Sequence, residues 1–92
     1  MASTFEELVA KRRAADQAHQ RVEELRHSYG PPTQNLWTRR QSHTYETAVR
    51  AWRDLDRDAQ AAVTGYAKER GQARDTVEGQ VREAAQGAEP GQ

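Results

Sequence analysis

Cysteine and isoleucine are absent from this chain of 92 residues, and large aliphatic side chains are scarce. The lack of cysteine excludes disulfides, thiolate nucleophiles and thiolate metal sites. Leucine, valine and phenylalanine together make up 11 of the 92 residues. This share is well under the level of roughly 20% below which a chain approaches the composition of disordered proteins. Any core that this chain builds is therefore thin.

Net charge is also lacking, because 14 basic residues balance 14 acidic ones. Disordered chains combine low apolar content with a large net charge, so this balance argues for a folded domain. The remaining apolar residues are mainly alanines and a few aromatics, which favour helix strongly and core volume weakly. We expect a small helical domain that gains stability from a partner surface, such as a second copy of the chain.

Long apolar runs are missing as well. No stretch approaches the roughly 20 residues of a membrane-spanning helix. The first residues lack the basic and apolar segments of a signal peptide. We therefore expect a cytoplasmic protein without membrane contact.

The first helical segment begins with a capping-box pattern, Thr4-x-x-Glu7, which a second pattern of the same kind overlaps. A hydroxyl and a carboxylate at this spacing satisfy the first free amides of a helix. Apolar positions then recur at steps of three and four, with one charge at Lys11. A Gly-Pro-Pro sequence at 30–32 ends the pattern, because proline lacks the amide that helix continuation needs. The sequence predicts a helix over residues 4–29.

A longer helical pattern follows, with its apolar side chains within about 60° of Trp52 on a helical wheel. Basic residues precede Gly71, which is typical of a helix C-terminus with a left-handed glycine cap. We expect a long helix over 35–70, a break at Gly71 and a weaker third helix over 73–86. Residues 1–86 would form one domain, and 87–92 a disordered tail.

The predicted helix lengths differ, and the difference leaves two arrangements open. A first helix of about 26 residues spans roughly 39 Å and the second roughly 53 Å, so a simple hairpin leaves Val63 and Tyr66 uncovered. Either the third helix folds back over them, or a second chain covers them. The predicted fold class is all-α, an antiparallel helical hairpin or a three-helix bundle.

The apolar stripe of the second and third helices is the candidate interface. Aromatic residues at helical spacing usually belong to cores or to coiled-coil-like interfaces rather than to ligand grooves. We expect a homo-oligomer, most simply a dimer, and a protein partner on the remaining surface. The members of the stripe are Trp37, Tyr45, Val49, Trp52, Leu55, Val63, Tyr66 and Val77.

A basic ridge lies opposite the stripe on the same wheel. Such a ridge suits phosphates or an acidic protein face, with Trp37 as a stacking platform at one end. Because the net charge is zero, a solvated helix face is the simpler interpretation, and Lys11-Arg12-Arg13 in the first helix is interpreted in the same way. The members of the ridge are Arg39, His43, Arg50, Arg53 and Arg57.

Two pairs, Glu24-x-x-His27 and His43-x-x-Glu46, have the spacing of metal ligands in helix bundles. Both face away from the predicted core, so we interpret them as surface pairs, with His19 at the edge of an interface. The sequence contains no nucleophile with a base at a recognisable spacing and no phosphate loop. It therefore predicts no catalytic, metal or cofactor site. The expected function is that of a small non-enzymatic interaction protein, an adaptor or regulator, and the alternative is a DNA- or RNA-binding regulator that uses the basic ridge.

Overall fold

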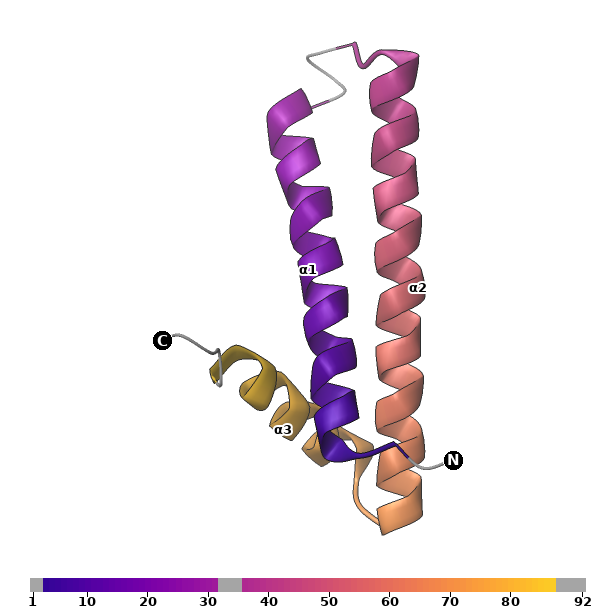
Figure 1. The fold of residues 1–92 in the computed structure, drawn as a ribbon, viewed down its shortest axis with the longest axis vertical. Coiled ribbons are helices and arrows are strands. Elements are labelled where there is room, and N and C mark those ends of the chain that lie inside the picture. The colour runs from indigo at the N-terminus through magenta and orange to yellow at the C-terminus, as the bar shows by residue number, and fades with distance from the viewer. Residues whose placement is uncertain (1–2, 32–35, 88–92) are drawn as a thin grey trace.

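The structure, a computed structural model, describes residues 3–31 and 36–87, and over these residues the chain is all-α, as predicted. Its helices are α1 (Phe5–Tyr29), α2 (Arg39–Arg70) and α3 (Arg74–Gly87). The first two run antiparallel as a long hairpin, and α3 packs across the end farthest from the α1–α2 connection (Figure 1). We call this end the base, and the opposite end, where α1 passes to α2, the loop end.

Both helices of the hairpin begin at a threonine cap. Thr4 and Glu7 form the predicted capping box, so α1 starts one residue later than expected. The predicted start of the second helix at residue 35 is wrong, since Thr38 caps α2. The Gln41 amide donates to Thr38 Oγ1 at 3.0 Å, and Gln41 Oε1 accepts from the Thr38 amide at 2.9 Å. The sequence Thr-x-x-Gln is itself a capping box and fixes this start.

The predicted break at Gly71 is confirmed. Gly71 has φ 65° and ψ 31°, the left-handed conformation, and the next amide, of Gln72, donates to the Ala67 carbonyl at 2.9 Å. This bond satisfies a carbonyl at the end of α2 and turns the chain towards α3. Gly87, which we placed in the tail, is the last residue of α3, and the rest of the predicted tail lies outside the described residues.

The main core lies at the base, where the three helices meet. One face of α3 inserts Val77 and Val81 between the hairpin helices and buries Val63 of α2. Of the two arrangements that the sequence left open, the first therefore holds at this end: the third helix of the same chain covers the overhang. The buried members of this core are Leu8, Val9, Val63, Ala67, Val77, Val81 and Ala85.

A buried arginine extends this core, which corrects our interpretation of Lys11-Arg12-Arg13 as a solvated face. Arg12 is only 4% exposed, and its guanidinium lies 2.6 Å from Asp56 Oδ1 and 3.3 Å from Asp16 Oδ1. Lys11 pairs with Asp58 at 2.7 Å, and Arg13 donates to the carbonyls of α3 residues 84 and 85. The three side chains do diverge around the helix, but two of the directions lead to α2 and one to α3.

The Arg12 guanidinium also changes the acidity of its partner. By donating a hydrogen bond to Asp56, it holds the pKa of that carboxyl below the usual value, against the opposing effect of burial. Gln60 donates a further hydrogen bond to the same carboxylate at 2.7 Å. The pair is therefore a charged link between α1 and α2, next to the apolar core.

Candidate protein interface

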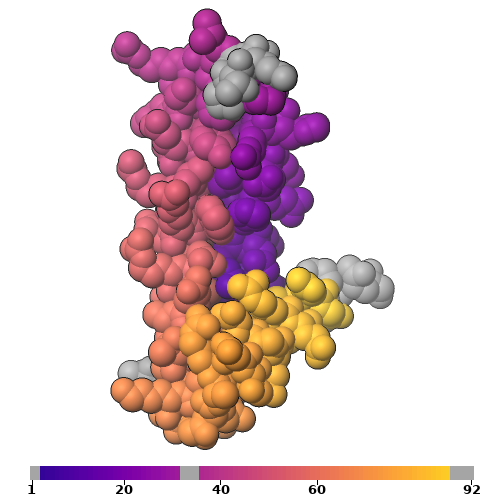
Figure 2. Space-filling view, turned by 180° about the vertical axis from the view of Figure 1, so that it is seen from behind, coloured from indigo at the N-terminus to yellow at the C-terminus, as the bar shows by residue number. Residues whose placement is uncertain are grey.

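One side of the hairpin is covered by α3 at the base only. On this side, α3 buries Val9 of α1 and Ala67 of α2, and Arg74 Nε donates to Thr64 Oγ1 at 3.1 Å. Figure 2 shows this side, with α3 lying over the base and the two hairpin helices uncovered towards the loop end. Over this loop-end half, the residues that the structure describes form two helices, α1 and α2.

Two hollows that share Arg53 and Arg57 lie along α2 beyond α3, one also lined by Tyr45 and Val49 and the other by Trp52. In a coiled-coil-like hairpin, residues seven apart lie on nearly the same side of a helix. Val49 lies fourteen residues before Val63 and Arg53 fourteen before Ala67, so they carry the α3-facing side of α2 towards the loop end. The loop-end groove is defined by Tyr45, Val49 and Trp52 of α2 with His19 and Val22 of α1.

The apolar side chains of this groove are incompletely covered. Val22 is buried between the helices, but Trp52, Val49 and Tyr45 remain half-buried. The His19 ring packs against Trp52 with the ring centroids 4.6 Å apart, which places His19 at the edge of the groove. The groove therefore offers aromatic and aliphatic surface to the outside along almost two turns of α2.

An aromatic cluster that shares Tyr45 with the groove fixes the loop end. Trp37 packs edge-on against Tyr29 of α1 at 5.3 Å between ring centroids and against Tyr45 of α2 at 5.0 Å. Its indole Nε1 donates to the Gly30 carbonyl at 2.9 Å. Trp37 is thus engaged in holding the two helix ends together, and it does not stand free as a stacking platform at the end of the basic ridge.

The predicted apolar stripe is divided by the tertiary structure. Val63 and Val77 belong to the core at the base, and Tyr66 packs beside it, with its ring centroid 6.3 Å from that of Phe5. Leu55 is 38% exposed at the edge of the stripe. Of the eight stripe residues, Tyr45, Val49 and Trp52 are those that the groove brings together.

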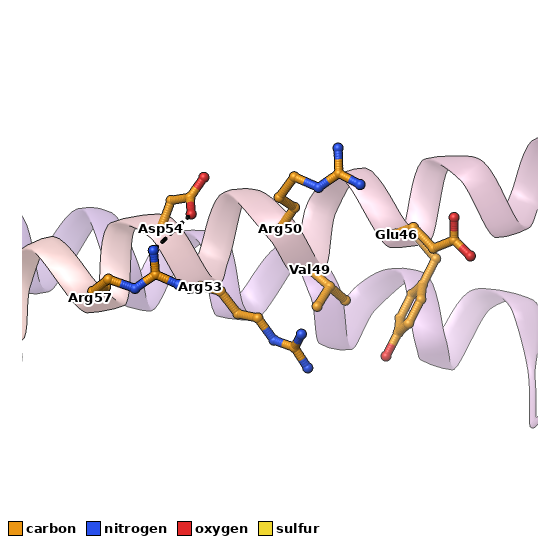
Figure 3. Close-up of a pocket in the computed structure, with 7 residues that line it drawn as sticks. Glu46, Val49, Arg50, Arg53, Asp54 and Arg57 are labelled. Carbon is orange, nitrogen blue, oxygen red and sulfur yellow. Dashed lines mark ion pairs between the residues drawn. The ribbon is translucent and has the colours of Figure 1, made fainter.

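The basic ridge is exposed throughout, at Arg39, His43, Arg50, Arg53 and Arg57. Arg57 lies 3.8 Å from Asp54, whereas in the described part of the chain no carboxylate lies within 4.0 Å of Arg50 or Arg53. These arginines line a shallow hollow on α2 together with Tyr45, Val49, Glu46 and Asp54 (Figure 3). The ridge thus borders the groove, a contact between the two predicted sites that the sequence analysis did not identify.

The two ends of the molecule differ in charge. The loop-end half, residues 19–31 and 36–53, contains six arginines and three glutamates. The base, residues 3–18 and 54–87, contains eight basic and ten acidic residues. The zero net charge of the sequence therefore conceals a positive end, and the groove lies within it.

The histidine–carboxylate pairs do not form a metal site. Within residues 3–31 and 36–87, no group of three histidine, aspartate or glutamate side chains is arranged to hold a metal ion. Glu24, His27, His43 and Glu46 are all exposed. In the same ranges, no helix combines the length and the apolar content needed to cross a bilayer.

Comparisons with known proteins assign no relative. The groove and the ridge are therefore interpreted from their own geometry. No family model, no curated protein and no solved structure matches this chain.

Proposed function

We propose that this chain is a small, non-enzymatic helical interaction protein, an adaptor or regulator that binds other proteins and associates with itself. The observation that carries the proposal is the half-burial of Trp52, Val49 and Tyr45 along a two-helix segment. Apolar surface that lies together at an otherwise polar exterior marks binding sites. At the base, α3 covers the equivalent surface, and nothing in the described chain covers it at the loop end.

The small core supports the same proposal. In the loop-end half, the buried apolar side chains are Val22 and Leu25, so little apolar area offsets the entropy of ordering two long helices. Each further Å² of apolar surface that a partner covers contributes about 25 cal/mol. Association is therefore expected to stabilise this half of the hairpin more than the base.

Sedimentation equilibrium at several protein concentrations tests self-association. We expect a mass above that of one chain, most simply a dimer, and a shift towards the monomer for Trp52→Ala. Leu36→Ala is the control, because Leu36 is 99% exposed beyond the groove. Circular dichroism must show that both variants remain helical. A cooperatively folded wild-type protein that stays monomeric at all concentrations would contradict self-association.

Nucleic-acid binding is the second candidate function, favoured by Arg50 and Arg53 of the ridge, which are exposed and have no carboxylate within 4.0 Å among residues 3–31 and 36–87. If they contact phosphates, affinity for DNA or RNA should fall steeply with salt, and reversing Arg50 and Arg53 to glutamate should abolish binding. A gel-retardation assay at low salt measures this. No retardation of either nucleic acid by the wild-type protein would remove this candidate.

A further inference from the structure

We propose that the loop-end groove binds an acidic amphipathic helix of another protein, which packs on the hairpin as α3 packs at the base. The inference rests on the proposed function as a protein-binding module, and it names the chemistry of the partner. Its basis is the juxtaposition of Trp52 and Val49 with Arg53, on the side of the hairpin that already holds one helix.

The helix α3 is an example of the kind of segment that packs on this side of the hairpin. It is an amphipathic helix of 14 residues that buries Val77, Val81 and Ala85, spaced four apart, between α1 and α2. This is the geometry in which helical segments dock into grooves of partner proteins. The hairpin side chains that receive α3 include Val63 and Ala67.

The receiving pattern recurs in the groove. Val49 repeats the position of Val63 two heptads nearer the loop end, and Trp52 and Tyr45 lie beside it as half-buried aromatic surface. Trp52 and Tyr45 are seven residues apart, about 10 Å along α2, which matches two apolar anchors spaced i and i+7 on a docked helix. The site therefore has receiving surface but no occupant from the described chain.

Charged side chains border the groove. Arg50, Arg53 and Arg57 line the hollow at its α2 edge together with Glu46 and Asp54, and Asp54 already pairs with Arg57. Arg50 and Arg53 have no carboxylate within 4.0 Å in the described residues, and the loop-end half as a whole is positive. Carboxylates on the flank of a docked helix would face these guanidinium groups and form charge-assisted hydrogen bonds. Complementary charge of this kind guides a partner into one orientation and excludes basic competitors.

The α1 edge favours a helix over a nucleic acid. Glu23 lies on this edge, where its carboxylate is 3.7 Å from His19 Nε2 and 3.7 Å from Arg26 Nη1, and Asp16 pairs with Arg12 nearer the base. These carboxylates would repel a phosphate backbone that followed the groove, whereas a helix that carries its own carboxylates only on the flank towards α2 keeps them away from Glu23 and Asp16.

Isothermal titration calorimetry with synthetic helical peptides tests the proposal. The probe is a blocked amphipathic peptide with leucine on one face, glutamate on one flank of that face and alanine elsewhere, and the control peptide carries lysine in place of glutamate. We expect saturable binding of the glutamate peptide to the full chain, at least about tenfold tighter than that of the lysine peptide. Amide chemical shifts should change around Val49 and Trp52.

Charge reversal sharpens the test without disturbing the core. Arg53→Glu, at an exposed position, should weaken the binding of the glutamate peptide by about tenfold or more and strengthen the binding of the lysine peptide. Lys68→Glu, at an exposed position near the base end of α2, is the matched charge reversal outside the groove and should leave both affinities unchanged. Circular dichroism of each variant confirms that the helices persist.

Three outcomes would overturn the inference. These are no binding of the glutamate peptide, equal binding of both peptides, and an affinity that Arg53→Glu leaves unchanged. Competition by single-stranded DNA for the same shifted amides would favour the nucleic-acid function instead. Sedimentation of the unliganded protein is measured separately, so retained self-association without peptide binding would refute this inference and leave the proposed self-association standing.

Discussion

Neutralising Asp56 should destabilise the protein clearly more than neutralising Asp58, although each carboxylate pairs with a neighbouring residue of α1. The distances alone do not distinguish the pairs, since Arg12–Asp56 measures 2.6 Å and Lys11–Asp58 measures 2.7 Å. Burial does distinguish them. The side chains are 5% and 28% exposed in the first pair, and 36% and 56% exposed in the second.

The magnitude follows from this difference in burial. Asp56→Asn keeps the shape and an acceptor for Arg12, but it removes the charge that compensates the buried guanidinium, and a buried charge left without its partner costs about 3–5 kcal/mol. We expect a loss of about 1–2 kcal/mol, limited by Asp16, which lies 3.3 Å from Arg12 Nε and retains part of the compensation. An exposed ion pair contributes about 0.2–1 kcal/mol, so Asp58→Asn should cost less than about 1 kcal/mol.

Urea unfolding followed by circular dichroism at neutral pH measures both losses. The protein concentration must be the same for all variants, because self-association would couple stability to concentration. In thermal unfolding, each kcal/mol corresponds to about 4–8 °C for a domain of this size. Equal losses for the two variants, or a larger loss for Asp58→Asn, would refute the reasoning from burial.

Three further predictions concern pH, the helix break and the third helix. Because the pKa of Asp56 is lowered on folding, its stabilisation is present above the unfolded pKa of about 3.9 and is lost as the pH falls through the lower folded pKa. Asp56→Asn should therefore flatten the acid side of the stability curve in urea titrations, and an unchanged slope would contradict this. Gly71→Ala should destabilise the protein by about 1 kcal/mol or more, because φ is 65° there. Gly65→Ala, where a Cβ meets no atom within 4 Å, should stabilise the protein by up to about 1 kcal/mol. If thermal unfolding showed both variants stabilised or both destabilised, these two predictions would be refuted. Val81→Ala removes buried volume under α3 and should cost roughly 2 kcal/mol, with faster hydrogen exchange in α3 than in α1; unchanged exchange in α3 would contradict it.

The sequence by itself determined the helices and most of their ends. Capping at Thr4 and the left-handed turn at Gly71 depend on hydrogen bonds within a few residues, so a local pattern suffices to predict them. The capping box at Thr38 is equally local and can be recognised in the sequence. The start of α2 was predicted four residues too early because this capping box was not used. Helical periodicity likewise identified Trp52 and its apolar neighbours.

Only the tertiary structure decided which of these side chains are buried and which groups meet. Arg12 and Asp56 are 44 residues apart, so their pairing depends on the register of α1 against α2 rather than on spacing along either helix. The apolar stripe is continuous on a helical wheel, but α3 crosses only the base, which buries Val63 and leaves Trp52 half-buried. A wheel records direction around one helix, whereas burial depends on where a second and a third helix pass. The positive loop end follows from the same cause, since the antiparallel hairpin brings distant charges of one sign together.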